Sequence, residues 1–199
     1  MPNLYDRFLE FLSSAEILEA SPALLNDQRR RFISEPDIIL QPHSIENVQK
    51  IIRFCFEHRI PVTPQGGNTG LCGAAVASSG VLLNLSKINR IREINLADNS
   101  ITVEAGAILQ NVQKAAAEAG RLFPLSLASE GSCEIGGNIA CNAGGLNVLR
   151  YGSMRDLVLG LEVVLPNGEL VSHLQPLHKN TTGYDLRHLF IGSEGTLGI

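Results

Sequence analysis

The uneven placement of glycine constrains this chain more than any other feature of its sequence. The 19 glycines gather in three clusters, at residues 66–73, 131–152 and 192–198. The first two clusters lie in stretches with almost no charge, because residues 61–86 contain no Lys, Arg, Asp or Glu and residues 131–149 contain only Glu134. Exposed linkers usually carry charge or serine-rich runs, so we expect these stretches to be buried or to face a ligand.

Glycine-rich loops of this kind can bind phosphate through their backbone. Glycine permits positive φ and close approach, and successive N–H groups form a concavity for anions. The runs 64–70, 136–138 and 142–145 predict a pyrophosphate held by amides rather than by lysines. For any one cluster, a tight turn in a β-rich core is an equal alternative, whereas the three together favour a large phosphate-bearing cofactor. The spacing matches neither a P-loop nor a Rossmann fingerprint.

Composition excludes several classes of protein. Hydrophobic residues make up 44% and charged residues 18%, which is typical of a folded domain. The net charge of −4 and the absence of Trp argue against nucleic-acid binding, and the sequence has neither a membrane-length apolar run nor a signal region. The four cysteines lack metal-site spacing and are expected to be buried thiols of a cytoplasmic protein: Cys55, Cys72, Cys133 and Cys141.

The residues between the glycines predict an α+β fold with mixed sheets and flanking helices. Helical spacing predicts a helix of about 14 residues after Ser44 and a second helix that stops at Gly120. The remaining pattern predicts short helical pieces over 4–34 and 184–190, strands at 37–40, 59–64 and 81–85, and hairpins at 91–105 and 157–171.

Three motifs resemble the two-lobed FAD-binding fold of the vanillyl-alcohol oxidase and p-cresol methylhydroxylase superfamily. They are PQGGNTGLCG (64–73), EGSCEIGGNIACNAGG (130–145) followed by Arg150-Tyr151-Gly152, and TGYDLRHLFIGSEGTLGI (182–199). The wording is most similar to the group that contains glycolate oxidase, D-lactate dehydrogenase and D-2-hydroxyglutarate dehydrogenase. The resemblance implies an N-terminal helical segment, 1–35, and an FAD-binding domain, 36–199, that ends before a C-terminal substrate domain.

The resemblance also implies which residues bind the cofactor. Relatives that attach flavin covalently often have a His where this chain has Asn68, so non-covalent FAD is expected. The implied FAD-binding residues are Pro64, Gln65, Gly66, Gly67, Asn68, Thr69, Gly70, Leu71, Gly73, Gly131, Ser132, Cys133, Ile135, Gly136, Gly137, Asn138, Asn142, Ala143, Gly144, Gly145, Tyr151, Glu194, Gly195, Gly198 and Ile199.

Such proteins oxidise a D-2-hydroxyacid to the 2-oxoacid by hydride transfer to flavin N5, and pass electrons to a quinone, a flavoprotein or a cytochrome. The residues that bind the substrate and remove its proton are expected downstream of residue 199, so no catalytic residue is assigned and no metal site is expected. The five histidines lie outside the cofactor loops and are interpreted as structural: His43, His58, His173, His178 and His188.

Two other functions stay open at this point. One is a different enzyme on the same fold, such as the enolpyruvyl-sugar reductase of cell-wall synthesis, whose pattern would lack the motif at 182–199. The other is a flavin-binding module or interaction partner without catalysis of its own. The apolar end Thr196–Ile199 further predicts self-association, and a homo-oligomer is one expected state.

Overall fold

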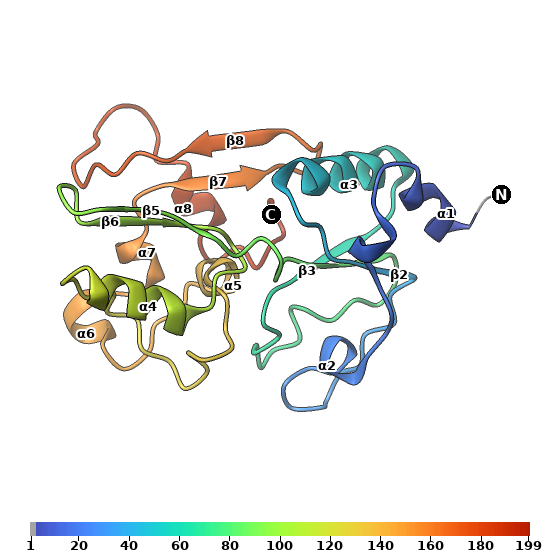
Figure 1. Cartoon of the computed structure of the whole chain (residues 1–199), viewed down its shortest axis with the longest axis horizontal. Helices are drawn as coiled ribbons and strands as arrows, with labels where there is room; N and C mark the ends of the chain where they lie inside the picture. The colour runs from blue at the N-terminus through green and yellow to red at the C-terminus, as the bar shows by residue number, and fades with distance from the viewer. Residues whose placement is uncertain (1–2) are drawn as a thin grey trace.

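The run Val81–Asn84 (β4) is buried at every position, which is typical of a central strand in a parallel sheet. It lies between β2 (Ile38–Leu40) and β3 (Val62–Gln65) and runs parallel to both. A two-residue strand, β1 (Ile17–Leu18), pairs antiparallel with β2 and completes the order β1-β2-β4-β3. The computed structural model describes residues 3–199, and this sheet forms the half of the molecule on the right of Figure 1.

Helix α3 (Ile45–His58) packs on this sheet, and its 14 residues confirm the length that the sequence predicts. It begins where the Ser44 hydroxyl accepts a hydrogen bond from the Asn47 N–H at 3.2 Å. Its buried face consists of Val48, Ile51, Ile52 and Cys55, which join the strand residues in one core. Because these side chains recur at helical spacing, the same pattern that predicts the helix also determines the face that packs.

The N-terminal residues pack onto the same half. They form α1 (Leu4–Leu9), a 3₁₀ turn (Ser14–Glu16), β1 and α2 (Pro22–Leu25). Phe8 is fully buried in the core around α3. The buried Glu16 carboxylate accepts hydrogen bonds from the Asn47 side chain and the His43 N–H, which ties the segment to the start of α3. The domain boundary proposed after residue 35 stays a prediction.

The second half contains two antiparallel hairpins, both of which the sequence predicts. Strands β5 (Ile91–Asn95) and β6 (Ser100–Val103) form one, and β7 (Leu161–Val164) and β8 (Leu170–His173) form the other. Arg92 joins them, because its guanidinium pairs with the buried Glu104 carboxylate and with Glu162. A separate core lies under these hairpins, with Leu109, Val112, Leu125, Met154 and Ile191 among its buried members.

Five helices complete the described part of this half. Helix α4 (Leu109–Glu118) ends near Gly120, which has a φ of +69°, as the predicted stop signal requires. The others are short: α5 (Ile135–Ala140), α6 (Val148–Tyr151), α7 (Met154–Leu157) and α8 (Arg187–Phe190). Across residues 3–199, no helix is long and apolar enough to cross a membrane.

The two halves are joined through β7. Val164 belongs to the core around α3, and its backbone exchanges two hydrogen bonds with Ile199, at 2.7 and 2.9 Å. The turn between β7 and β8 also contacts α3, where the Gln49 side chain donates to the Gly168 carbonyl at 3.1 Å. The last described residues consequently lie between the halves, as the C-terminal label in Figure 1 shows.

Two expectations about local structure are wrong. The second glycine cluster is not a continuous loop, because α5 and α6 form within it. The four cysteines are not all buried either: Cys55 and Cys133 are buried, but Cys72 and Cys141 are exposed. Both exposed thiols lie beside glycines on loop surfaces, where the lack of charged neighbours does not by itself imply burial.

Candidate functional site

The candidate site begins where the parallel strands end. Ligands bind open parallel sheets outside the carboxyl ends of the strands. Here β3 ends at the buried Gln65 and β4 at the buried Asn84, and these residues are paired in the sheet. The Asn84 amide donates to the Gln65 side-chain oxygen at 3.4 Å and accepts from Gln41 at 2.9 Å. This buried amide cluster fixes the start of the first glycine segment, residues 66–73.

The N-terminal residues anchor the first glycine segment from outside. Asn68 has a φ of 51°, a left-handed conformation that asparagine tolerates better than most residues. Its side-chain amide donates to the carbonyls of Ala23 and Asn26, at 3.1 and 2.7 Å. Further along, a Cβ built on Gly73 would meet the Phe32 ring at 3.1 Å. The Asn68 side chain therefore holds the segment against α2.

The second glycine segment, residues 131–145, packs directly against the first. A Cβ at Gly67 would lie 2.0 Å from the Ser132 carbonyl oxygen, and a Cβ at Gly66 would lie 2.9 Å from Glu134 Oε2. Gly136 is equally confined, because its Cβ would lie 2.8 Å from that of Ala105. These three glycines allow two backbones to meet, which is a reason for glycine that does not require a ligand.

The third glycine segment, residues 192–199, contacts both of the others. A Cβ at Gly195 would lie 2.5 Å from Pro64 Cγ, just before the first segment. The N–H groups of Gly192 and Glu194 donate to the carbonyls of Ile139 and Ala140 in α5, at 3.1 and 2.9 Å. The three clusters that are far apart in the sequence thus meet at one place in the fold.

Other glycines at this junction have open faces. A Cβ at Gly70 or at Gly137 would meet no described atom within 4 Å, and both residues are exposed. A Cβ at Gly131 would have only the Gln110 side chain nearby, at 3.5 Å. Backbone that is reachable here, between segments fixed by the confined glycines, is what a phosphate-bearing group needs in order to accept amide hydrogen bonds.

A buried carboxyl lies beneath the contact between the first two segments. Glu134 immediately precedes α5, is only 6% exposed, and accepts a hydrogen bond from the Ser86 hydroxyl at 2.7 Å through Oε1. Its Oε2 has no hydrogen-bond partner among residues 3–199, and neither has the side-chain nitrogen of Asn138 one turn later. Burial raises the pKa of Glu134 to about 7, against the opposing effect of the Ser86 hydrogen bond.

Several predicted site residues have structural contacts of their own. The Asn142 side chain accepts from the Arg155 N–H at 2.9 Å, and a Cβ at Gly145 would meet the Ser126 carbonyl oxygen at 2.1 Å. Those buried in the described core are Cys133 and Ile135, whereas Leu71 and Tyr151 are exposed and Thr69, Ala143, Gly144 and Gly198 are intermediate. Their roles toward a cofactor stay predictions.

Sequence reasoning missed Ser86, Asn84 and Glu134 as parts of this junction. Ser86 and Asn84 follow a buried strand, which is a signal for an edge position but not for a partner. Glu134 carried a clearer signal, because it is the one charged residue within 131–149. A lone acid in an apolar, glycine-rich stretch is expected either to be paired or to have a raised pKa.

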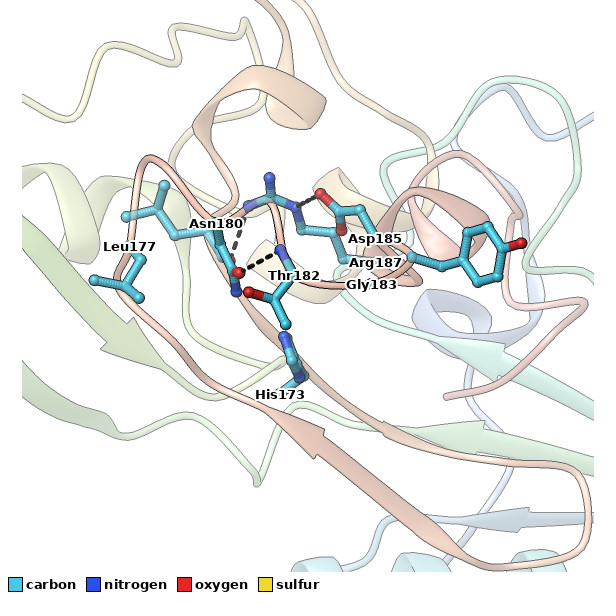
Figure 2. A pocket seen from close by; sticks show the side chains of 9 residues that line it. His173, Leu177, Asn180, Thr182, Gly183, Asp185 and Arg187 are labelled. Carbon is cyan, nitrogen blue, oxygen red and sulfur yellow. Dashed lines mark hydrogen bonds and ion pairs between the residues drawn. The ribbon is translucent and has the colours of Figure 1, made fainter.

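A small pocket elsewhere does not belong to this junction. It lies beside the end of β8, and Figure 2 shows His173, Asn180, Thr182 and Asp185 around it. The Arg187 guanidinium at its edge is already engaged, because it donates to the carbonyls of Val158 and Leu159 and to Asp185. No residue of the three glycine segments lines this pocket.

Comparison with known proteins identifies the family. The model of the FAD-binding domain family matches residues 36–173, which is most of the chain. The chain belongs to this family. D-2-hydroxyglutarate dehydrogenase of Xanthomonas citri pv. viticola is 48% identical over 187 residues, which cover 92% of this chain and 40% of that protein. The mitochondrial D-2-hydroxyglutarate dehydrogenase of Danio rerio is 47% identical, over 82% of this chain and 31% of that protein.

Solved structures agree with this FAD-binding fold. An alkyldihydroxyacetonephosphate synthase covers the whole chain with a TM-score of 0.84 at 19% identity, with 38% of that protein aligned. The 6-hydroxy-D-nicotine oxidase of Arthrobacter nicotinovorans covers 78% of the chain and 35% of its own, with a TM-score of 0.68 at 23% identity. The α+β fold of the vanillyl-alcohol oxidase type is thereby confirmed. The chain spans about 40% of the length of the first curated relatives it matches.

The junction of the glycine segments fits FAD, the cofactor of this family. The open faces of Gly70 and Gly137 leave backbone accessible where the segments converge. Residues 61–86 offer no acidic side chain to repel a pyrophosphate. The acid that lies nearest in the second segment, Glu134, is buried with a raised pKa. Amide donors and open glycines are the donor set that a dinucleotide phosphate requires.

Proposed function

We propose that this FAD-binding domain belongs to an oxidoreductase that oxidises a D-2-hydroxyacid to the 2-oxoacid, with D-2-hydroxyglutarate as the first candidate substrate. The observation that carries the proposal is the similarity of nearly the whole chain to D-2-hydroxyglutarate dehydrogenases, at 48% identity for the Xanthomonas citri protein. Identity at this level over 92% of the chain is a stronger argument for substrate class than the fold, which serves many reactions.

When bound, FAD supplies a hydride acceptor for carbon C2 of the hydroxyacid. The contribution of this chain is to hold that group in place, without a covalent link, since Asn68 uses its side chain to bind Ala23 and Asn26. Backbone at Gly70 and Gly137 is proposed to donate to the pyrophosphate. Packing of Gly66 and Gly67 against residues 132–134 keeps those donors in a fixed arrangement before the cofactor arrives.

Substrate binding and proton removal are not assigned to residues of this chain. The curated relatives are about two and a half times as long as the matched region, since 40% of the Xanthomonas citri protein is covered. The electron acceptor, a homo-oligomer and a cytoplasmic location stay proposals. The relative from Danio rerio is named as mitochondrial, so location differs among proteins of this similarity.

The test is anaerobic reduction of bound flavin. The protein is loaded with FAD and mixed with D-2-hydroxyglutarate, L-2-hydroxyglutarate or D-lactate in separate experiments, in the presence of the remaining sequence if more exists. The proposal expects the yellow flavin absorption to bleach with D-2-hydroxyglutarate and to stay unchanged with the L enantiomer. Bleaching by a nicotinamide donor, with no response to any hydroxyacid, would instead favour a reductase on the same fold.

A further inference from the structure

The contact between the first and second glycine segments contains one ionisable group whose charge state matters for their packing. Glu134 Oε2 faces Gly66, where an added Cβ would come within 2.9 Å of it. Oε1 is bound to Ser86, which follows β4, so one carboxyl group touches both the first segment and the end of the central sheet. The side chain is buried even though no cofactor covers it, so a cofactor would not reach it without movement.

The surroundings of Glu134 favour its uncharged form. A buried carboxylate needs hydrogen bonds to all its oxygen lone pairs, and here one oxygen has no partner among residues 3–199. A carboxylic acid needs less, because the charge that must be solvated is gone. Ionisation would therefore act to open the contact, since water can reach Oε2 only if residues 66–67 and 132–134 move apart.

Charged groups on the neighbouring elements do not offset this effect. The first segment carries none, and Lys87 beside Ser86 is exposed. Glu104 at the end of β6 is already paired with Arg90 and Arg92. Within its own segment, the titratable neighbours are Glu130, which accepts from Gln113, together with Cys133 and Cys141. The raised pKa of Glu134 is accounted for by burial, opposed only by Ser86.

We propose that Glu134 is a positioning residue that holds the two glycine segments together in its protonated form, so that FAD binding takes up a proton at this side chain. The inference rests on the proposed role of these segments in holding FAD, and it adds a pH dependence to that role. Only the fraction of protein with neutral Glu134 is competent to bind, so the apparent Kd rises as that fraction falls.

The size of the effect follows from the titration midpoint. With a pKa of about 7 in the flavin-free protein, about one molecule in eleven is neutral at pH 8 and nearly all are neutral at pH 6. The apparent Kd for FAD should therefore increase about tenfold between pH 6 and pH 8. Binding at pH 7 should take up about half a proton per FAD.

The experiment measures FAD affinity from pH 6 to pH 8 for the wild-type chain and for Glu134→Gln, by quenching of flavin fluorescence. Glutamine keeps the shape and the Ser86 contact but has no charge, so its Kd should vary less than twofold. Glu130→Gln is the matched control, because it removes a carboxylate of the same segment that does not face Gly66. It should keep the tenfold change of the wild-type chain.

A second measurement keeps the proposal testable if Glu134→Gln does not fold. Calorimetric titration of the wild-type chain with FAD, in buffers of different ionisation enthalpy, reports proton uptake directly. Uptake of about half a proton at pH 7 supports the proposal, and no uptake overturns it. Equal pH profiles for wild type and Glu134→Gln overturn this role of Glu134 alone. Failure of the folded wild-type chain to bind FAD at any pH would overturn the cofactor site as well.

Discussion

Replacement of Gly67 by alanine is the most direct structural test of the contact between the glycine segments. The new Cβ would lie 2.0 Å from the Ser132 carbonyl oxygen and 3.0 Å from its carbon. Because ordinary contacts require more than 3 Å, residues 132–133 must move by about 1 Å or more, and overpacking of this kind costs about 1–3 kcal/mol. The clash is with backbone, so no side-chain rotation relieves it, and we expect a loss of about 2–3 kcal/mol.

For a domain of this size, each kcal/mol lowers Tm by about 2–4 °C, so Gly67→Ala should unfold about 5–10 °C below the wild-type chain. The matched variant is Gly137→Ala, whose Cβ meets no described atom within 4 Å and lies in α5. Alanine is favoured over glycine in helices by up to about 1 kcal/mol, so this variant should be as stable as wild type or more so.

Flavin binding separates the two variants further. Gly67→Ala should lose both stability and FAD affinity, whereas Gly137→Ala should lose only affinity, because its methyl group fills an open face at the proposed pyrophosphate site. The assay combines thermal unfolding without flavin and a fluorescence titration with FAD. Wild-type Tm and affinity in Gly67→Ala would refute the contact, and wild-type affinity in Gly137→Ala would remove α5 from the cofactor site.

Three further predictions concern the supports of the site. Asn68→Ala should cost about 1–2 kcal/mol in chemical denaturation, because two hydrogen bonds to Ala23 and Asn26 are lost, and should speed proteolysis near α2. Arg187→Lys should lower Tm by several degrees, because lysine cannot replace a guanidinium bound to two carbonyls and Asp185. Although burial opposes it, hydrogen bonding by Arg90 and Arg92 lowers the pKa of Glu104 below 4.5; its stabilising effect should be full above that pH and disappear as pH falls through the lowered value, which thermal unfolding at pH 3–6 would detect by comparison with Glu104→Gln.

Local sequence signals account for much of the fold. Ser44 and the apolar stripe of α3 determine a helix start, length and packing face, and Gly120 supplies the left-handed position at which α4 stops. Both hairpins follow from alternation around turn residues. These elements were predictable because the interactions that define them lie within a few residues of one another.

Long-range pairing was not predictable in the same way. The parallel order β2-β4-β3 joins strands through contacts between residues about 20 to 40 positions apart, and nothing in a short window specifies it. The glycines show the same limit, since sequence marks Gly67 and Gly137 alike. Only the fold shows that one meets the Ser132 backbone and the other an open face.

The central claim, that the convergent glycine segments hold FAD, is tested most directly by identifying what the purified protein releases. The chain is denatured with acid, and the supernatant is analysed by chromatography against FAD and FMN standards. The account predicts a yellow chromophore that co-migrates with FAD at about one equivalent per chain, with none left on the precipitate. A colourless folded protein that also fails to bind added FAD would contradict it.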